Sequence, residues 1–130
     1  MTINDPLANA LSKILNSERQ GKPTCVLFPA SGMIKNVLGV LQDHHYLGAY
    51  QETNDSKGNY VDVALIGRIN KCGSVKPRFA VKANEYAKFE KRYLLAKGFG
   101  ILIVSTPKGI MTHTQAKEQH VGGRLLAYCY

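Results

Sequence analysis

The segment Ile101–Gly109 reads Ile-Leu-Ile-Val-Ser-Thr-Pro-Lys-Gly, and it is the stretch that decides the fold. Ile101–Thr106 forms a nearly continuous apolar run, which predicts a strand that is buried on both faces. Pro107-Lys108-Gly109 predicts a turn directly after this strand. Two hydroxyl groups, one ammonium group and one glycine therefore lie at the tip of a buried strand, and a rigid strand would fix their direction.

The residues before this strand show an extended and then a helical pattern. Val75–Val81 is expected to be extended. Asn84 is a candidate N-cap of a helix whose aromatic residues are Tyr86, Phe89 and Tyr93. Aromatic residues among lysines can stack on unpaired bases, but this spacing also makes a core stripe, and we expect Phe89 and Phe99 in the core.

The end of the chain predicts two further elements. Thr112 and Gln115 have the spacing of a capping box, which predicts a short helix that runs to His120. Gly122-Gly123 is expected to end that helix. Arg124–Tyr130 predicts a final strand.

The first half of the chain predicts the order helix, strand, helix, strand, strand. Asp5 followed by Pro6 favours a helix start, and Gly21 favours its stop. The other expected elements are a strand at 24–28, a helix that Ser31 caps, and two strands at 46–53 and 60–66 that a turn at 54–58 joins.

The two halves are expected to form separate lobes. Gly67–Gly73 has glycines at both ends and mixed polarity, which is typical of a boundary. We therefore predict an α/β (α+β) fold with an N-terminal lobe over 1–66, a linker over 67–73 and a mixed C-terminal lobe over 74–130.

The positive charge is concentrated in the second half of the chain. Residues 1–65 hold five basic and six acidic side chains, whereas residues 66–130 hold twelve basic and three acidic ones. Nine of these twelve fall between Arg68 and Lys97. Phosphate backbones are the commonest partners of a basic folded surface, so this half is expected to bind nucleic acid. The alternative is that the charge only keeps the protein soluble.

The sequence offers little for catalysis, cofactors or metals. It contains no P-loop, no dinucleotide fingerprint and no nucleophile elbow. Cys25, Cys72 and Cys129 lack CxxC spacing and the four histidines form no metal-ligand pattern. No apolar run reaches the roughly 20 residues of a membrane span, and the N-terminus lacks the pattern of a signal peptide. We expect no enzyme, no cofactor, no metal, no small-molecule substrate and no membrane partner.

The turn after the buried strand is the first candidate binding site. The hydroxyls of Ser105 and Thr106 can donate to phosphate or ribose, and Lys108 can bind phosphate. Gly109 lets a ligand approach the backbone closely. The alternative is an ordinary turn in which Ser and Thr are turn formers.

The double glycine before the last strand is the second candidate binding site. Gly122-Gly123 permits close approach of another backbone, and Arg124 can reach a phosphate or stack on a base. The alternative is a helix C-cap followed by an ordinary surface arginine.

The chain resembles a known family from Asp5 to Tyr130. The segments that carry the resemblance are Asp5–Leu11, Gly67–Gly73, Pro77–Phe79, Gly98–Gly109 and Val121–Tyr128. They are similar to small-subunit ribosomal protein eight, a universal family. Arg124 and the Asn-Lys-Cys-Gly sequence at 70–73 resemble the archaeal and eukaryotic branch of that family.

The resemblance implies two α/β lobes, no catalysis, and binding to the central domain of small-subunit ribosomal RNA early in assembly, among neighbouring ribosomal proteins. It gives Ser105, Thr106 and Gly109 a role in RNA contact, and Gly122-Gly123 a role in close approach. The sequence departs from the family at Pro107, where Ser is usual. Proline removes one hydroxyl and stiffens the loop.

The predicted RNA-binding set contains Ser105, Thr106, Pro107, Lys108, Gly109, Gly122, Gly123, Arg124, Ser31 and Lys35. The expected location is the cytoplasmic ribosome, with nucleolar assembly if the protein is eukaryotic. A basic regulator that acts on messenger RNA outside the ribosome is the alternative function, and a small hydrolase or nuclease that acts on RNA is a third. Cosedimentation with small subunits separates a ribosomal protein from the first of these alternatives.

Overall fold

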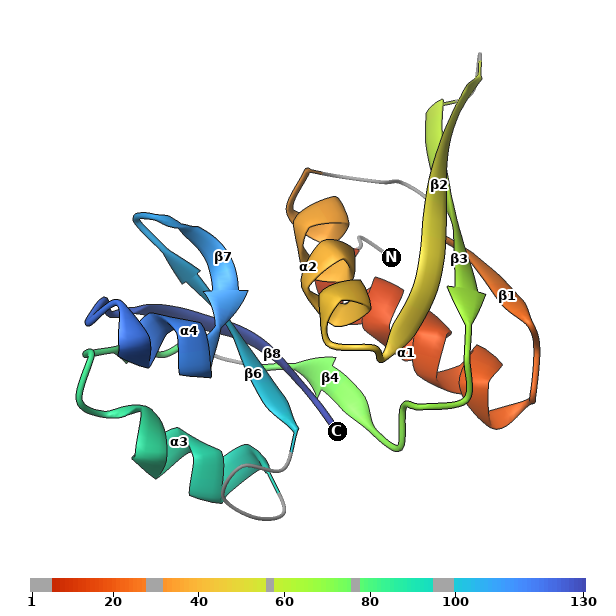
Figure 1. The fold of residues 1–130 in the computed structure, drawn as a ribbon. Coiled ribbons are helices and arrows are strands. Elements are labelled where there is room, and N and C mark those ends of the chain that lie inside the picture. The colour runs from red at the N-terminus through yellow and green to blue at the C-terminus, as the bar shows by residue number, and fades with distance from the viewer. Residues whose placement is uncertain (1–5, 28–31, 56–57, 76–77, 95–99) are drawn as a thin grey trace. The chain divides into compact units, whose positions relative to one another are not determined.

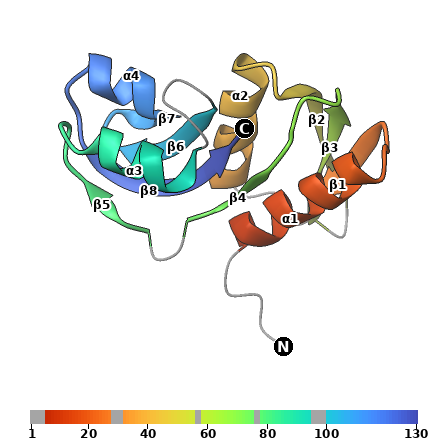
Figure 2. The same ribbon diagram turned by 90° about the horizontal axis from the view of Figure 1, so that it is seen from below.

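The computed structural model describes residues 6–27, 32–55, 58–75, 78–94 and 100–130. The chain divides into two compact units, Met1–Asn70 and Lys71–Tyr130 (Figure 1, Figure 2). Each unit combines helices with an antiparallel sheet, which confirms the predicted α+β fold with two lobes. The division falls within the segment 67–73 that the sequence predicts as a linker.

The N-terminal unit packs two helices on a three-stranded sheet. Its elements are α1 (Pro6–Arg19), β1 (Thr24–Leu27), α2 (Gly32–Asp43), β2 (Leu47–Asp55) and β3 (Gly58–Leu65), and the strand order is β1-β3-β2. Alternation places Cys25, Leu27, Val61 and Val63 on the buried face, where α1 packs against β1 and α2 against β2. The predicted order of elements is confirmed for this unit.

The hairpin of β2 and β3 is longer than the sequence predicts. The antiparallel ladder continues through Asn54↔Asn59 to Asp55↔Gly58, so the prediction of a turn over all of 54–58 is wrong. Asn, Asp and Gly are typical turn residues, but here backbone pairing with the opposite strand keeps them in the ladder.

The C-terminal unit packs two helices on a five-stranded antiparallel sheet. Its elements are β4 (Cys72–Ser74), β5 (Ala80–Val81), α3 (Tyr86–Tyr93), β6 (Ile101–Thr106), β7 (Gly109–Thr112), α4 (His113–Glu118) and β8 (Gly123–Cys129). The strand order is β4-β8-β6-β7, and β5 pairs with β8 beyond the end of β4. The apolar strand at 101–106 and the strand at the C-terminus are both confirmed.

The short strands of this unit differ from the prediction. In the segment 75–81, which is expected to be extended, the described residues that form a strand are Ala80–Val81, and β4 occupies the end of the predicted linker. β7 was not predicted. β4 and β5 exist because the long strand β8 offers them a pairing partner far away in the sequence, which a local pattern does not reveal. β7 pairs with β6 directly across the turn that the sequence predicts.

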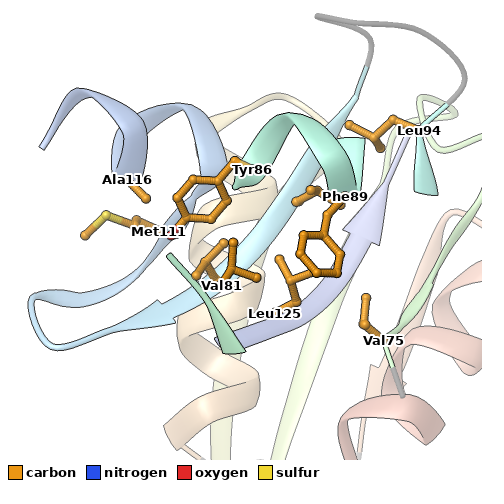
Figure 3. Packing of buried hydrophobic residues seen from close by; sticks show 10 residues of the cluster. Val75, Val81, Tyr86, Phe89, Leu94, Met111, Ala116 and Leu125 are labelled. Carbon is orange, nitrogen blue, oxygen red and sulfur yellow. The ribbon is translucent and has the colours of Figure 1, made fainter. Parts of the chain in front are cut away.

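The core of the C-terminal unit lies between one face of the sheet and the two helices. Figure 3 shows Tyr86 and Phe89 reaching from α3 into this core, where Val81, Leu125, Met111 and the α4 residue Ala116 meet them. Phe89 is buried, as the sequence predicts, and Tyr86, for which the pattern leaves RNA and core both open, is buried as well. Phe99 lies outside the described residues.

The helix ends of the C-terminal unit confirm one prediction and correct two. Thr112 and Gln115 form the predicted capping box, in which the Thr112 hydroxyl accepts from the Gln115 amide at 3.2 Å. Asn84 is not the N-cap of α3, because Glu85 occupies that position without a side-chain cap. Gly122-Gly123 does not end α4. The helix stops at Glu118, and His120 adopts a left-handed φ of 55° there.

Candidate nucleic-acid interface

The turn between β6 and β7 is a tight hairpin loop. Thr106 pairs with Gly109, which leaves only Pro107 and Lys108 in the loop, both exposed. The proline ring fixes φ near −65°, which excludes the primed hairpin turns, and Lys108 has no positive φ, so the turn is of type I. Gly109 follows with a φ of 119°, which is a conformation that favours glycine.

The Thr106 hydroxyl holds this turn together. It donates to the Gly109 carbonyl oxygen at 2.7 Å and accepts from the Lys108 amide at 3.1 Å. The residue is buried, with 8% of its surface exposed. Thr106 therefore positions Lys108 and Gly109, and its donor is already used within the protein.

Ser105 points to the opposite face of the sheet from Thr106. Val104 and Thr106 alternate with it, and Val104 faces the helix-covered core. Its cross-strand partners are Ile110 on β7 and Arg124 on β8. Ser105 is half-buried, and its hydroxyl has no hydrogen-bond partner within the described ranges. A free hydroxyl on a rigid strand can bind a ligand acceptor.

Arg124 is brought directly beside Ser105 by the pairing of β6 and β8. Residues that pair directly across an antiparallel ladder have Cβ atoms about 4.5–5.5 Å apart. On the other side, Arg124 pairs with the exposed Ala80 of β5. Arg124 is exposed and forms no ion pair with any carboxylate that the structure describes. The two predicted segments thus form one surface, which we call the Ser105–Arg124 surface and which also includes Ala80 and Ile110.

The two glycines before Arg124 bring three strands close together. A Cβ on Gly122 would lie 2.5 Å from the Val81 carbonyl oxygen, and a Cβ on Gly123 would overlap the carbonyl oxygen of Ser105. The close approach that these glycines permit is therefore an approach of the chain to itself. It holds β8 against β5 and β6 and so places Arg124 beside Ser105.

A hydrogen bond from α3 fixes the start of this glycine segment. The Tyr86 hydroxyl donates to the Val121 carbonyl oxygen at 3.0 Å. Tyr86 is almost fully buried, and this burial raises the pKa of its phenol above the usual value of 10.0. The phenol is therefore neutral and able to donate throughout the physiological range.

The model of one protein family, described as ribosomal protein S8, matches residues 5–130. The chain belongs to the ribosomal protein S8 family. It is accordingly a ribosomal protein that binds ribosomal RNA, and its location is the ribosome. Proteins of such a family are generally structural, and they contact ribosomal RNA and other ribosomal proteins.

The charge of this S8-family chain lies in the unit that carries the Ser105–Arg124 surface. Residues 1–70 hold six basic and six acidic side chains, whereas residues 71–130 hold eleven basic and three acidic ones. Lys82 lies close to the segment that leads to Arg124, since its Cα would be 3.2 Å from a Cβ built on Gly122. The side chain of Lys82 is exposed. The sequence did not single out Lys82, because only the pairing of β5 with β8 brings it there.

The two remaining predicted residues belong to the N-terminal unit. Lys35 lies on α2 of the N-terminal unit, where its ammonium group forms an ion pair with Glu52 at 3.1 Å. Ser31 lies outside the described residues. RNA contact by these two residues stays a prediction.

The described part of the chain holds no group of three or more His, Cys, Asp or Glu side chains that could bind a metal ion. Among the described residues, no helix is long and apolar enough to cross a membrane. Cys25, Cys72 and Cys129 are buried, and none of them forms a disulfide with another described cysteine.

Proposed function

We propose that this chain binds the central domain of small-subunit ribosomal RNA and supports its assembly, and that the Ser105–Arg124 surface makes the specific contact. The observation that carries the proposal is the direct pairing of Ser105 with Arg124 on the sheet face opposite the helices. A free hydroxyl and an unpaired guanidinium side by side can bind a ribose or base edge and a phosphate together.

The roles of the other residues follow from their contacts. Thr106 and Pro107 set the hairpin turn, so that Lys108 projects from its tip toward phosphate. Gly122-Gly123 keeps the three strands together. In this proposal Lys82 and Lys108 supply affinity through charge, while the Ser105–Arg124 surface recognises the shape of an irregular RNA.

The role we infer is structural and without catalysis, in the small subunit of a cytoplasmic ribosome, with nucleolar assembly if the organism is eukaryotic. The resemblance of Arg124 and of the Asn-Lys-Cys-Gly sequence at 70–73 supports the archaeal or eukaryotic branch of the family.

Filter binding tests the proposed contact. The wild-type protein should bind a fragment of the central domain more tightly than an unrelated RNA duplex of equal length. Arg124→Gln should weaken binding to the fragment about tenfold to a hundredfold, because a hydrogen bond to a charged group contributes about 1.5–3 kcal/mol. Arg19→Gln is the matched control, since Arg19 is an exposed arginine at the end of α1. Equal affinity of Arg124→Gln and wild type for the fragment would remove this surface from the site.

A further inference from the structure

The outer side of α3 carries a row of three exposed cations, Lys88, Lys91 and Arg92. The inner side of the same helix buries Tyr86, Phe89 and Glu90. Because residues three and four apart lie on one side of a helix, Lys88 is a neighbour of both Lys91 and Arg92. We call these three residues the α3 row.

Among the residues that the structure describes, no carboxylate forms an ion pair with the α3 row. The only acidic residue within α3 is Glu90, and its buried carboxylate binds Lys117 of α4 and lies 3.3 Å from His113 Nε2. The three cations of the row therefore repel one another in the free protein. An anionic partner would relieve that repulsion.

The stability of the helix does not account for the position of Lys88. Lys91 and Arg92 are in the last turn of α3, where a cation interacts favourably with the helix dipole. Lys88 is three residues after the N-cap Glu85, close to the positive end of the dipole, where an acidic side chain is favoured. The row thus contains a cation that is unfavourable in the isolated helix.

Aromatic rings hold Arg92 in place. Its guanidinium carbon lies 4.9 Å from the ring centre of Phe79 and 5.5 Å from that of Tyr93. Phe79 is itself packed against Phe89, with 5.6 Å between the ring centres. A guanidinium that stacks on a ring keeps its N–H edge available for phosphate and has less conformational freedom to lose on binding.

The α3 row and the Ser105–Arg124 surface lie on opposite sides of the same sheet. α3 packs on the face that carries Val104 and Leu125, whereas Ser105 and Arg124 point to the other face. We propose that the α3 row is a second RNA-binding surface, which holds the phosphate backbone of a different RNA segment and does not read its sequence. This inference needs only that the chain binds ribosomal RNA, and it does not depend on the role of Ser105 and Arg124.

The salt dependence of RNA binding tests the second surface. In the full chain, Lys88→Gln, Lys91→Gln and Arg92→Gln are combined, and the affinity for the central-domain RNA is measured between 50 and 200 mM salt. Each phosphate contact contributes about 0.7–0.9 to the slope of log affinity against log salt, so the slope should become less steep by about 2 to 3. The preference for the central-domain RNA over an unrelated duplex should stay the same.

A matched variant controls for net charge. Lys13→Gln, Arg19→Gln and Lys22→Gln remove three exposed cations from the N-terminal unit. This control should leave the slope within about 0.5 of the wild-type slope. A slope that is unchanged in the α3 variant, or reduced equally in both variants, would overturn the inference. A loss of preference in Arg124→Gln with an unchanged slope in the α3 variant would leave the proposed function standing and remove the second surface.

Directed cleavage locates the contact. An iron chelate is attached to Lys91→Cys or to Lys108→Cys in the complex with RNA, since the native thiols are buried. Position 91 should cleave an RNA segment that position 108 does not cleave. In assembled subunits, absence of RNA cleavage from position 91 would contradict the inference.

Discussion

One face of the C-terminal sheet lies beneath α3 and α4, and the other carries Ser105 and Arg124. The first face consists of apolar side chains such as Val104 and Leu125, and its cations lie one layer further out, on the surface of α3. On the second face a hydroxyl and a guanidinium extend directly from paired strands. Groups on a strand have a fixed direction, whereas lysines on a helix surface keep their rotamer freedom.

This difference suggests that specific RNA recognition and general electrostatic attraction of RNA come from different faces. The hydroxyls of Ser105 and Thr106 illustrate the difference between the faces, because these two adjacent residues point to opposite faces of the sheet. The Thr106 hydroxyl bonds within the hairpin turn, and the Ser105 hydroxyl stays available. Charge alone thus does not mark the specific site, although the whole unit is strongly basic.

The largest effect is expected from Gly123→Ala, which would force β6 and β8 apart and so separate Ser105 from Arg124. The new Cβ would overlap the Ser105 carbonyl oxygen, so β6 and β8 must move apart. Forced overpacking costs about 1–3 kcal/mol, and contact with backbone places this case near the upper end. Urea unfolding should show a loss of about 3 kcal/mol, and RNA binding should fall with it.

Gly39→Ala is the control for that substitution. Its Cβ would meet only the Tyr50 hydroxyl at 3.7 Å, inside α2. Alanine in a helix interior is more stable than glycine by roughly 0.5–1 kcal/mol, so this variant should be stabilised. A loss of stability equal to that of Gly123→Ala would refute the assignment of Gly123 as a close-approach residue.

The adjacent hydroxyls of Ser105 and Thr106 are expected to have different roles, one in RNA binding and one in stability. Thr106→Val should lower the free energy of unfolding by about 1–2 kcal/mol, because two hydrogen bonds of the turn are lost. Ser105→Ala should change it by less than about 0.5 kcal/mol but weaken binding to the central-domain RNA by about 1 kcal/mol. Urea unfolding and filter binding of both variants measure the two quantities. If Ser105→Ala instead lowered stability and Thr106→Val instead weakened RNA binding, the roles given to these two hydroxyls would be wrong.

Tyr86→Phe tests the link between α3 and Val121, which precedes the strand that carries Arg124. Loss of the hydrogen bond to the Val121 carbonyl should cost about 1 kcal/mol at pH 7. The pKa of Tyr86 is raised by burial, so the native state holds the phenolic proton more tightly than the unfolded state. Its contribution is complete below about pH 10 and is lost as the pH rises further. Urea unfolding at pH 7 and pH 10.5 should show a smaller alkaline loss in Tyr86→Phe than in wild type, and an equal loss would contradict this assignment.

The smallest effect is expected from His120→Gly, at the end of α4. The Val121 amide donates to the Ala116 carbonyl and the His120 amide to the Lys117 carbonyl, which is a Schellman motif with histidine at the left-handed position. Glycine removes the penalty of a left-handed side chain but has more entropy to lose. Thermal unfolding should show a gain of about 0.5 kcal/mol, whereas a clear loss would mean that the imidazole makes a needed contact.

The parts of the fold with a local cause were predictable. Gly21 ends α1 in a Schellman motif, as its glycine indicates, and the capping box of Thr112 and Gln115 starts α4. The same motif at His45 and His120 could not be predicted, because a non-glycine residue adopts positive φ only when surrounding hydrogen bonds require it.

The sequence could predict which segments contribute to the candidate site, but not how their residues lie relative to one another. The sequence indicates Ser105, Arg124 and the double glycine, but their grouping depends on the register of β6 and β8. The glycines at 122 and 123 fit a helix end equally well by pattern. Only the short distances from a Cβ at these positions to the carbonyl oxygens of Val81 and Ser105 show that glycine is needed for the close contact between strands.

The central claim is that the Ser105–Arg124 surface selects the RNA, while the α3 row only attracts it. The most direct measurement is the ratio of affinities for the central-domain fragment and an unrelated duplex, at one salt concentration. The combined Ser105→Ala and Arg124→Gln variant should lower this ratio at least tenfold, and the variant with Lys88, Lys91 and Arg92 changed to Gln should lower both affinities and leave the ratio unchanged. A ratio that falls equally in the two variants would contradict the account.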